Sequence, residues 1–203
     1  GLGDVYKRQA HDYEPTTSDI AKLQKAQVII VNGAGYDAWA VKAAQTANAT
    51  IVNAAEVGRV NDGENPHVWF SADVRKAVAQ AITEAYEQAD AAKKNDFDKM
   101  NDQWTAEENN VESKIAEVKQ KTDGLAYAAT ESVASYLAED MGLADATPSG
   151  YARATANESE PTPTDIKQFT DALKAGEIKL LVVNTQEESE LTGKITDAAK
   201  SVE

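Results

Sequence analysis

The stretch "EPTTSDIAKLQKAQVIIVN" (residues 14–32) occurs a second time in a related form, "EPTPTDIKQFTDALKAGEIKLLVVN" (residues 160–184). Both copies open with Glu-Pro-Thr, continue with Asp-Ile at the same offset, and end in a short apolar run. The runs "VIIVN" and "LLVVN" are typical of strands in a parallel sheet that is covered on both faces. Because the match is short, chance similarity is the alternative to a true repeat.

Each copy predicts a helix that leads into a strand. Thr16 with Asp19, and Thr162 with Asp165, have the spacing of a capping box in which aspartate takes the place of glutamate. Pro163 suits the first position of the second helix. The same unit in both halves of the chain predicts an α/β fold of two similar lobes, each a mostly parallel sheet flanked by helices.

The sequence between the copies predicts mainly helices. Residues 95–121 carry a narrow apolar stripe among many charges, which indicates a long amphipathic helix. After Gly124, "LAYAAT" predicts a strand, and residues 132–141 predict a helix that ends at Gly142, before a loop rich in Pro, Ser and Thr. Ser71 is a good N-cap for an earlier helix, whose apolar face comprises Val74, Val78, Ala81, Ile82 and Ala85.

These elements divide the chain into four parts. Residues 1–10, which include "GLGDVYKRQ", have no periodicity, and we expect a non-native or disordered start there, such as a sequencing remnant. We place the N-terminal lobe at residues 11–92, a connecting helix at 93–122 and the C-terminal lobe at 123–203.

Composition limits the kinds of partner. The net charge of −14 disfavours nucleic acids and anionic membranes, because both would repel the chain. The sequence contains no cysteine, so any bound metal must be held by histidine and carboxylate. No apolar run approaches the ~20 residues that span a bilayer, and the N-terminus has no apolar signal-peptide core.

Three residues could form a metal site. His11 and His67 are the two histidines of the chain and lie in loop-type sequence, and Glu131 follows the "AYAAT" strand. Imidazole and carboxylate groups from separate strand-end loops suit a divalent metal. Alternatively, His67 is a structural loop histidine beside an anchoring Trp69, and Glu131 is a charge at a helix N-terminus. "NGAGYDAW" lacks the third glycine of a dinucleotide fingerprint, and no serine has a nucleophile-elbow context.

Three stretches together resemble a known family. They are "HDYEPTTSDIAKLQKAQVIIVNGAGYDAW" (residues 11–39), "NPHVWFSADVRKAVAQAI" (65–82) and "TESVASYLAEDMGL" (130–143). In this order they resemble the zinc and manganese receptors of bacterial ABC importers, the metal-specific cluster A-I solute-binding proteins. The resemblance extends over nearly all of residues 11–200.

The resemblance implies a function and a ligand set. It implies an extracytoplasmic receptor, periplasmic or lipid-anchored, that captures a divalent transition metal between two lobes and delivers it to an ABC permease. His11 and His67 would be ligands from the N-terminal lobe and Glu131 from the C-terminal lobe. The cargo would be zinc or manganese, with iron as a further candidate; glutamate at the third position is common in manganese receptors. It also implies a rigid connecting helix, no enzymatic activity, a monomer, and a link to cell adhesion.

Two parts of the family pattern have no counterpart in this sequence. One is the fourth ligand, which would lie beyond Glu203, and the other is the first strand and helix ahead of His11. We therefore expect both lobes to be incomplete and the chain to be a fragment. The alternative function is a metal-dependent hydrolase that uses the same His-His-Glu cluster and a bound water, although no H-E-x-x-H motif is present.

Overall fold

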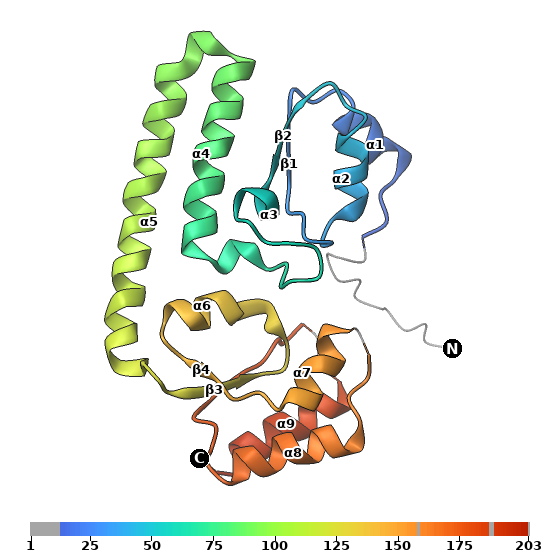
Figure 1. Ribbon diagram of the computed structural model, residues 1–203, viewed down its shortest axis with the longest axis vertical. Coiled ribbons are helices and arrows are strands. Elements are labelled where there is room, and N and C mark those ends of the chain that lie inside the picture. Colours follow the sequence, from blue (N-terminus) through green and yellow to red (C-terminus); the bar gives the residue numbers. More distant parts are fainter. Residues whose placement is uncertain (1–12, 158, 187–188, 203) are drawn as a thin grey trace. The chain divides into compact units, whose positions relative to one another are not determined.

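The computed structural model describes residues 13–157, 159–186 and 189–202 (Figure 1). The chain divides into two compact units, Gly1–Glu112 and Ser113–Glu203. The division falls inside the longest helix, α5 (Lys94–Thr122). In the described part of the chain, no helix is both long and apolar enough to cross a membrane.

Unit 1 is a two-stranded parallel sheet with helices on both faces. Strands β1 and β2 pair in register from Val28 with Thr50 to Val31 with Asn53. Figure 1 shows α1 and α2 on one side of the strands and α4 on the other. The described elements are α1 (Thr17–Leu23), β1 (Val28–Val31), α2 (Ala38–Ala44), β2 (Thr50–Asn53), α3 (Ala54–Val57), η2 (Val68–Phe70), α4 (Ala72–Ala89), η3 (Ala91–Lys93) and α5.

The core of unit 1 lies on both sides of this narrow sheet. Ile29 and Val31 of β1 pack against Ala40 and Ala44 of α2. The apolar sequence of the strands predicts that both faces of the sheet are covered. This prediction is wrong in part, because Ile30 and Ile51 are 47% and 42% exposed. A sheet of two strands has no inner strand, so each of these side chains has a neighbouring strand on one side only.

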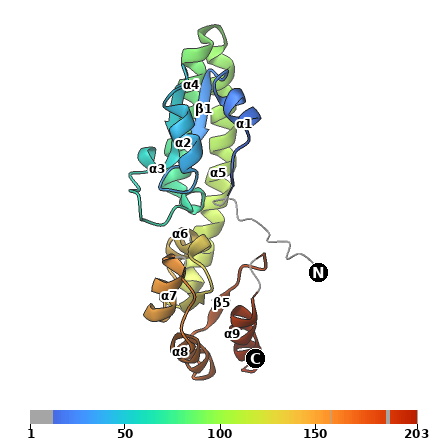
Figure 2. The same ribbon diagram turned by 90° about the vertical axis from the view of Figure 1, so that its right-hand side faces the viewer.

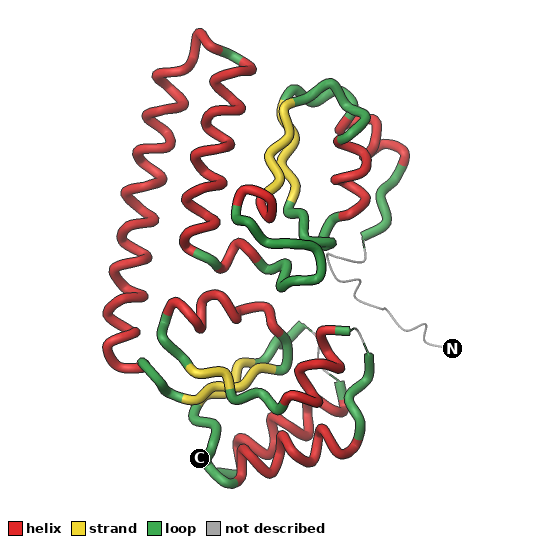
Figure 3. The backbone as a smooth tube through the Cα atoms, in the orientation of Figure 1, coloured by secondary structure: helices red, strands yellow, loops and turns green. Residues whose placement is uncertain are grey.

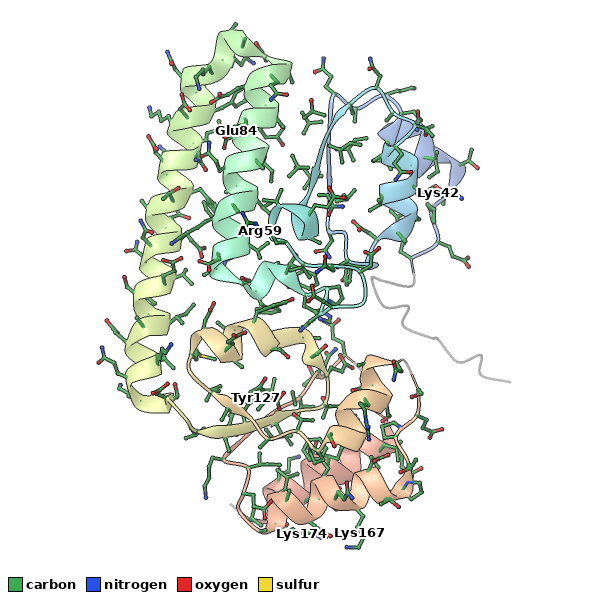
Figure 4. The ribbon with its side chains drawn as sticks, in the orientation of Figure 1. Lys42, Arg59, Glu84, Tyr127, Lys167 and Lys174 are labelled. Atoms are coloured by element: carbon green, nitrogen blue, oxygen red, sulfur yellow. The ribbon has the colours of Figure 1, made fainter. Side chains whose placement is uncertain are left out.

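Unit 2 contains a three-stranded parallel sheet in the order β4-β3-β5. Figure 2 labels β5 of this sheet and the helices α8 and α9. Ala128 of β3 packs against a cluster that includes Ile166 and Phe169 of α8 and Ile195 of α9. Tyr127, the preceding residue, lies on the face of the sheet that α6 covers (Figure 4). The described elements are β3 (Ala126–Ala129), η4 (Ser132–Ala134), α6 (Ser135–Asp140), β4 (Ala144–Asp145), α7 (Ser149–Ala156), α8 (Pro163–Lys174), β5 (Leu180–Val182) and α9 (Glu190–Lys200).

The repeat and its capping boxes are confirmed. Helices α1 and α8 both begin with a complete capping box, made by Thr16 with Asp19 and by Thr162 with Asp165. The helix of each copy leads to a parallel strand, β1 in one unit and β5 in the other (Figure 3). Ser71 caps α4 as predicted, through its hydroxyl and the backbone N–H of Val74.

One predicted loop is wrong. The Pro-, Ser- and Thr-rich segment after Gly142 contains strand β4 and helix α7. Helix α7 begins with serine and glycine and holds one threonine, and all three residue types favour a helix less than alanine does. Tyr151 of α7 is buried, and its ring meets that of Phe169 edge-on at 4.9 Å. Tertiary packing therefore stabilises a helix that propensity does not predict.

Phe169→Ala is expected to lower the free energy of unfolding by ~3–5 kcal/mol, because the ring is fully buried and its removal leaves a cavity. Lys174→Ala, on the same helix but pointing away from the unit (Figure 4), is the control and should change stability by less than ~0.5 kcal/mol. Urea unfolding followed by circular dichroism measures both. Equal effects of the two substitutions would contradict this account of the core.

Candidate functional site

The loop that carries His67 is tied to the end of β1 by Asn32. The Asn32 side-chain amide donates to the backbone oxygen of Pro66 at 2.9 Å and to that of Gly33 at 3.0 Å. The carboxylate of Asp37 accepts hydrogen bonds from the backbone N–H groups of Asn32 (2.7 Å) and Gly33 (2.9 Å). The strand end, the turn after it and the histidine loop therefore form one hydrogen-bonded assembly.

Gly33 is required where this turn passes the end of β2. Its φ is +76°, a left-handed conformation that L side chains rarely adopt. A Cβ at this position would also overlap the side-chain oxygen of Asn53, the last residue of β2. The glycine lets the two strand ends approach each other beside the histidine loop.

Asn65 sets the tautomer of His67. The Asn65 side-chain oxygen accepts from the backbone N–H of His67 at 3.2 Å and lies 2.6 Å from ring Nδ1. Because this oxygen is an acceptor, Nδ1 carries the hydrogen, and the lone pair of the neutral ring is on Nε2. Metal-ligating histidines have the same arrangement, in which one nitrogen donates to a neighbour and the other binds the ion.

Aromatic rings surround the His67 imidazole. The ring of Trp69 lies 5.3 Å from it and that of Tyr36 lies 6.2 Å from it, both edge-on. Burial, followed by the nearby charge of Asp37, raises the pKa of Tyr36 above its usual range. The alternative from the sequence is a structural loop histidine. The structure shows that the hydrogen-bond partner of the His67 ring is the side chain of Asn65.

His11 lies outside the described residues, which begin at Tyr13. The Tyr13 hydroxyl donates to the Asp19 carboxylate at 2.7 Å, and its ring lies 5.5 Å from that of Trp39. Hydrogen bonds from Thr16, and then from Tyr13, hold the pKa of Asp19 well below its usual range. The capping box of α1 thus also anchors Tyr13.

Glu131 lies at the carboxyl end of the unit 2 sheet. It follows β3, and its carboxylate accepts from the side-chain amide of Asn184 at 2.8 Å. Asn184 follows the neighbouring strand β5, and its backbone N–H donates to the Thr130 hydroxyl at 3.3 Å. Glu131 makes no side-chain capping bond to the short helix η4. The Asn184 amide therefore orients this carboxylate.

Tyr151 lies near Glu131 and binds the residue before it. Its hydroxyl donates to the backbone oxygen of Thr130 at 3.2 Å. Burial, followed by repulsion from Glu131, raises the pKa of Tyr151 to about 12. The tyrosine therefore stays neutral at physiological pH beside the carboxylate.

Sequence reasoning missed the asparagines that position the candidate ligands. Asn32 and Asn184 end the two related strand sequences, so the repeat contained the signal for them. Asn65 precedes Pro66 and His67, where an acceptor side chain two residues before an imidazole could have been noticed. Within the described ranges, His, Asp and Glu side chains form no group of three or more that could hold a metal ion.

The family model described as ZnuA, zinc-uptake complex component A, periplasmic, matches residues 6–203. The chain belongs to this family. Among curated relatives of this ZnuA-family chain, a metal ABC transporter substrate-binding lipoprotein of Lactococcus lactis is 27% identical over 199 residues, covering 88% of this chain and 61% of the relative. The high-affinity zinc uptake system protein ZnuA of Bacillus subtilis is 21% identical over 194 residues, covering 85% and 60%.

Solved structures confirm the ZnuA-like fold. A crystal structure of ZnuA has a TM-score of 0.75 and 19% identity, and the match covers 96% of this chain and 75% of that one. The laminin-binding protein Lmb of Streptococcus agalactiae matches with a TM-score of 0.75 and 19% identity, covering 95% and 74%. The α/β fold class, with parallel sheets flanked by helices and a long helix, is confirmed. The chain spans less than two thirds of the length of the curated relatives named above.

Asn65→Ala is expected to shift His67 from the Nδ1–H tautomer toward the Nε2–H tautomer, because the acceptor for Nδ1–H is lost. Ring ¹⁵N resonances above the imidazole pKa distinguish the two forms, and a chain with two histidines gives a simple spectrum. Asn61→Ala, in the same loop but bonded to Glu64, is the control and should leave the tautomer unchanged. Wild-type protein with its ring hydrogen on Nε2 would contradict the Asn65 assignment.

The raised pKa of Tyr151 predicts a loss of stability in alkali. A folded pKa of about 12, above the ordinary value of 10.0, means that the stabilisation is complete below about pH 10 and is lost as the pH rises through about 12. Tyr151→Phe should flatten this part of the curve of stability against pH. Urea unfolding at intervals of about half a pH unit, between about pH 9 and 12, measures the effect.

Glu131→Gln should lower the pKa of Tyr151 in a spectrophotometric titration, because it removes the negative charge that raises this pKa. The exposed Glu177→Gln is the control and should leave the pKa of Tyr151 unchanged.

Proposed function

We propose that this chain belongs to an extracytoplasmic binding protein that captures a divalent transition metal ion as substrate and delivers it to the permease of an ABC importer. The observation that supports this most is the Asn65–His67 hydrogen bond, which directs the ring lone pair to Nε2. It occurs in a chain of the ZnuA family, whose description includes zinc uptake and the periplasm.

The proposed ligands are His11, His67 and Glu131. Each of the two described ligands is oriented by an asparagine, His67 by Asn65 and Glu131 by Asn184. Imidazole and carboxylate groups together suit zinc, manganese or iron. A carboxylate favours manganese, whereas the Irving–Williams order favours zinc in raw affinity. Relatives are named for zinc in Bacillus subtilis, manganese in Streptococcus anginosus and iron in Yersinia pestis.

Transport rather than catalysis is the proposed activity. The family is named as an uptake component, and the relatives reported above are named as a substrate-binding lipoprotein and an uptake protein. No observation favours the hydrolase alternative, so it is not proposed. The partner is the membrane permease, the protein acts as a monomer, and its localisation is periplasmic or lipid-anchored outside the cytoplasmic membrane. Lmb is described as both an adhesin and a metal transporter, but no surface of this chain is assigned to adhesion.

His67→Ala and Glu131→Ala are each expected to weaken zinc and manganese binding by more than the ~10–100-fold that loss of an outer-shell partner causes, because each removes a proposed ligand. Competition against a chromophoric chelator, with metal-free protein, measures the affinities. Glu107→Ala removes one carboxylate from an exposed position on α5 and is the charge-matched control. Wild-type affinity in the His67→Ala variant would refute the site.

A further inference from the structure

Helix α5 buries one charged side chain. Glu108 is 7% exposed, and it is the buried residue of this helix. Its carboxylate accepts from Arg75 of α4, through Nε at 3.0 Å and Nη2 at 2.5 Å. The remaining guanidinium nitrogen of Arg75, Nη1, donates to the backbone oxygen of Trp69 at 3.2 Å. All three residues belong to unit 1.

A helix pair does not need a buried ion pair for stability. Desolvation of two charges offsets most of their attraction, and apolar residues of similar size are often equally stable. Arginine differs from an apolar residue because its planar guanidinium can bind several acceptors at fixed angles. Here the guanidinium bonds to α5 with one edge and to the histidine loop with Nη1.

We propose that the Arg75–Glu108 pair is a clamp through which α5 positions the loop of His67. Glu108 fixes the guanidinium, Arg75 fixes the backbone of Trp69, and the Trp69 ring packs edge-on against the His67 imidazole. Arg75 and Glu108 are therefore positioning residues, which act on the metal through the loop. This clamp rests on the proposed function, since its purpose is to hold His67 ready for an ion and so reduce the ordering required on binding.

The chain offers a matched control one residue along α4. Lys76 forms an ion pair with Glu112 of α5, at 2.6 Å to Oε2 and 2.5 Å to Oε1. This second pair joins the same two helices, but it is more exposed, with 40% and 30% of the two side chains accessible. A purely structural role predicts similar consequences for both pairs, whereas a clamp predicts a difference at His67.

The test compares Arg75→Met/Glu108→Leu with Lys76→Met/Glu112→Leu in the 203-residue chain. Zinc and manganese affinities come from chelator competition, and the state of the His67 ring comes from ¹⁵N spectra of metal-free protein. The clamp variant should bind ~10-fold more weakly, at the lower end of outer-shell effects, and its His67 resonances should shift or broaden. The control variant should match wild type in both measurements, and both variants should remain folded by circular dichroism.

Arg75→Lys separates the ion pair from the loop contact. Lysine can keep the charge pair with Glu108 but lacks the guanidinium fork, so the variant should stay folded and still show the altered His67 ring. It also replaces the double variant as the test if that variant fails to fold. Wild-type affinity and wild-type ring resonances in a folded clamp variant would overturn the proposal. If wild-type protein binds neither metal, the proposed function fails, and the metal-free spectra alone decide the clamp.

Discussion

The side-chain amide of Asn32 holds together the part of unit 1 on which the candidate chemistry depends. It stands at the carboxyl end of β1 and binds the backbone of the loop one residue before His67. Tyr36, in the turn after β1, adds ring contacts to His67 and Trp69 of the same loop. A rigid strand therefore determines where the imidazole lies, and Asn65 then determines which ring nitrogen carries the lone pair. The amide of Asn32 therefore sets the position of His67, and the amide of Asn65 sets its tautomer.

In unit 2, too, an asparagine after a strand binds a neighbouring segment and orients a candidate ligand. Asn184 follows β5 as Asn32 follows β1, and it binds the carboxylate of Glu131 at the end of the neighbouring strand. Parallel strands present their carboxyl ends at one edge of a sheet, so a short side chain at one strand end can reach the segment after the next. The related sequences of the two copies thus encode both a supersecondary unit and a means of orienting a residue beside it.

The sequence predicts the features that have local signals. The capping boxes at Thr16 and Thr162, the N-cap Ser71 and the long helix α5 are encoded by residues close together in the chain. Helix α7 has no such local signal, because burial of Tyr151 against Phe169, which is distant in the sequence, stabilises it.

In the candidate site, too, the local features could be predicted and the long-range contacts could not. His67 and Glu131 could be singled out from residue type and loop context. The bonds that orient them connect Asn32 with Pro66 and Asn184 with Glu131, which are 34 and 53 residues apart. Asn65 and its bond to His67 are local, yet asparagine before proline is usual in loops for reasons of backbone geometry alone.

Neutral amides orient both candidate ligands, and this affects the charge around them. A lysine or arginine in place of Asn184 would neutralise Glu131 and compete with an incoming cation for the same carboxylate. An aspartate in place of Asn65 would favour the protonated imidazolium, which has no lone pair for a metal. An amide supplies one directional hydrogen bond and no net charge, so neither Asn184 nor Asn65 adds a charge to the group that it orients. Arg75 and Glu108, which hold the loop of His67, are paired with each other, so they fix the loop without adding a net charge.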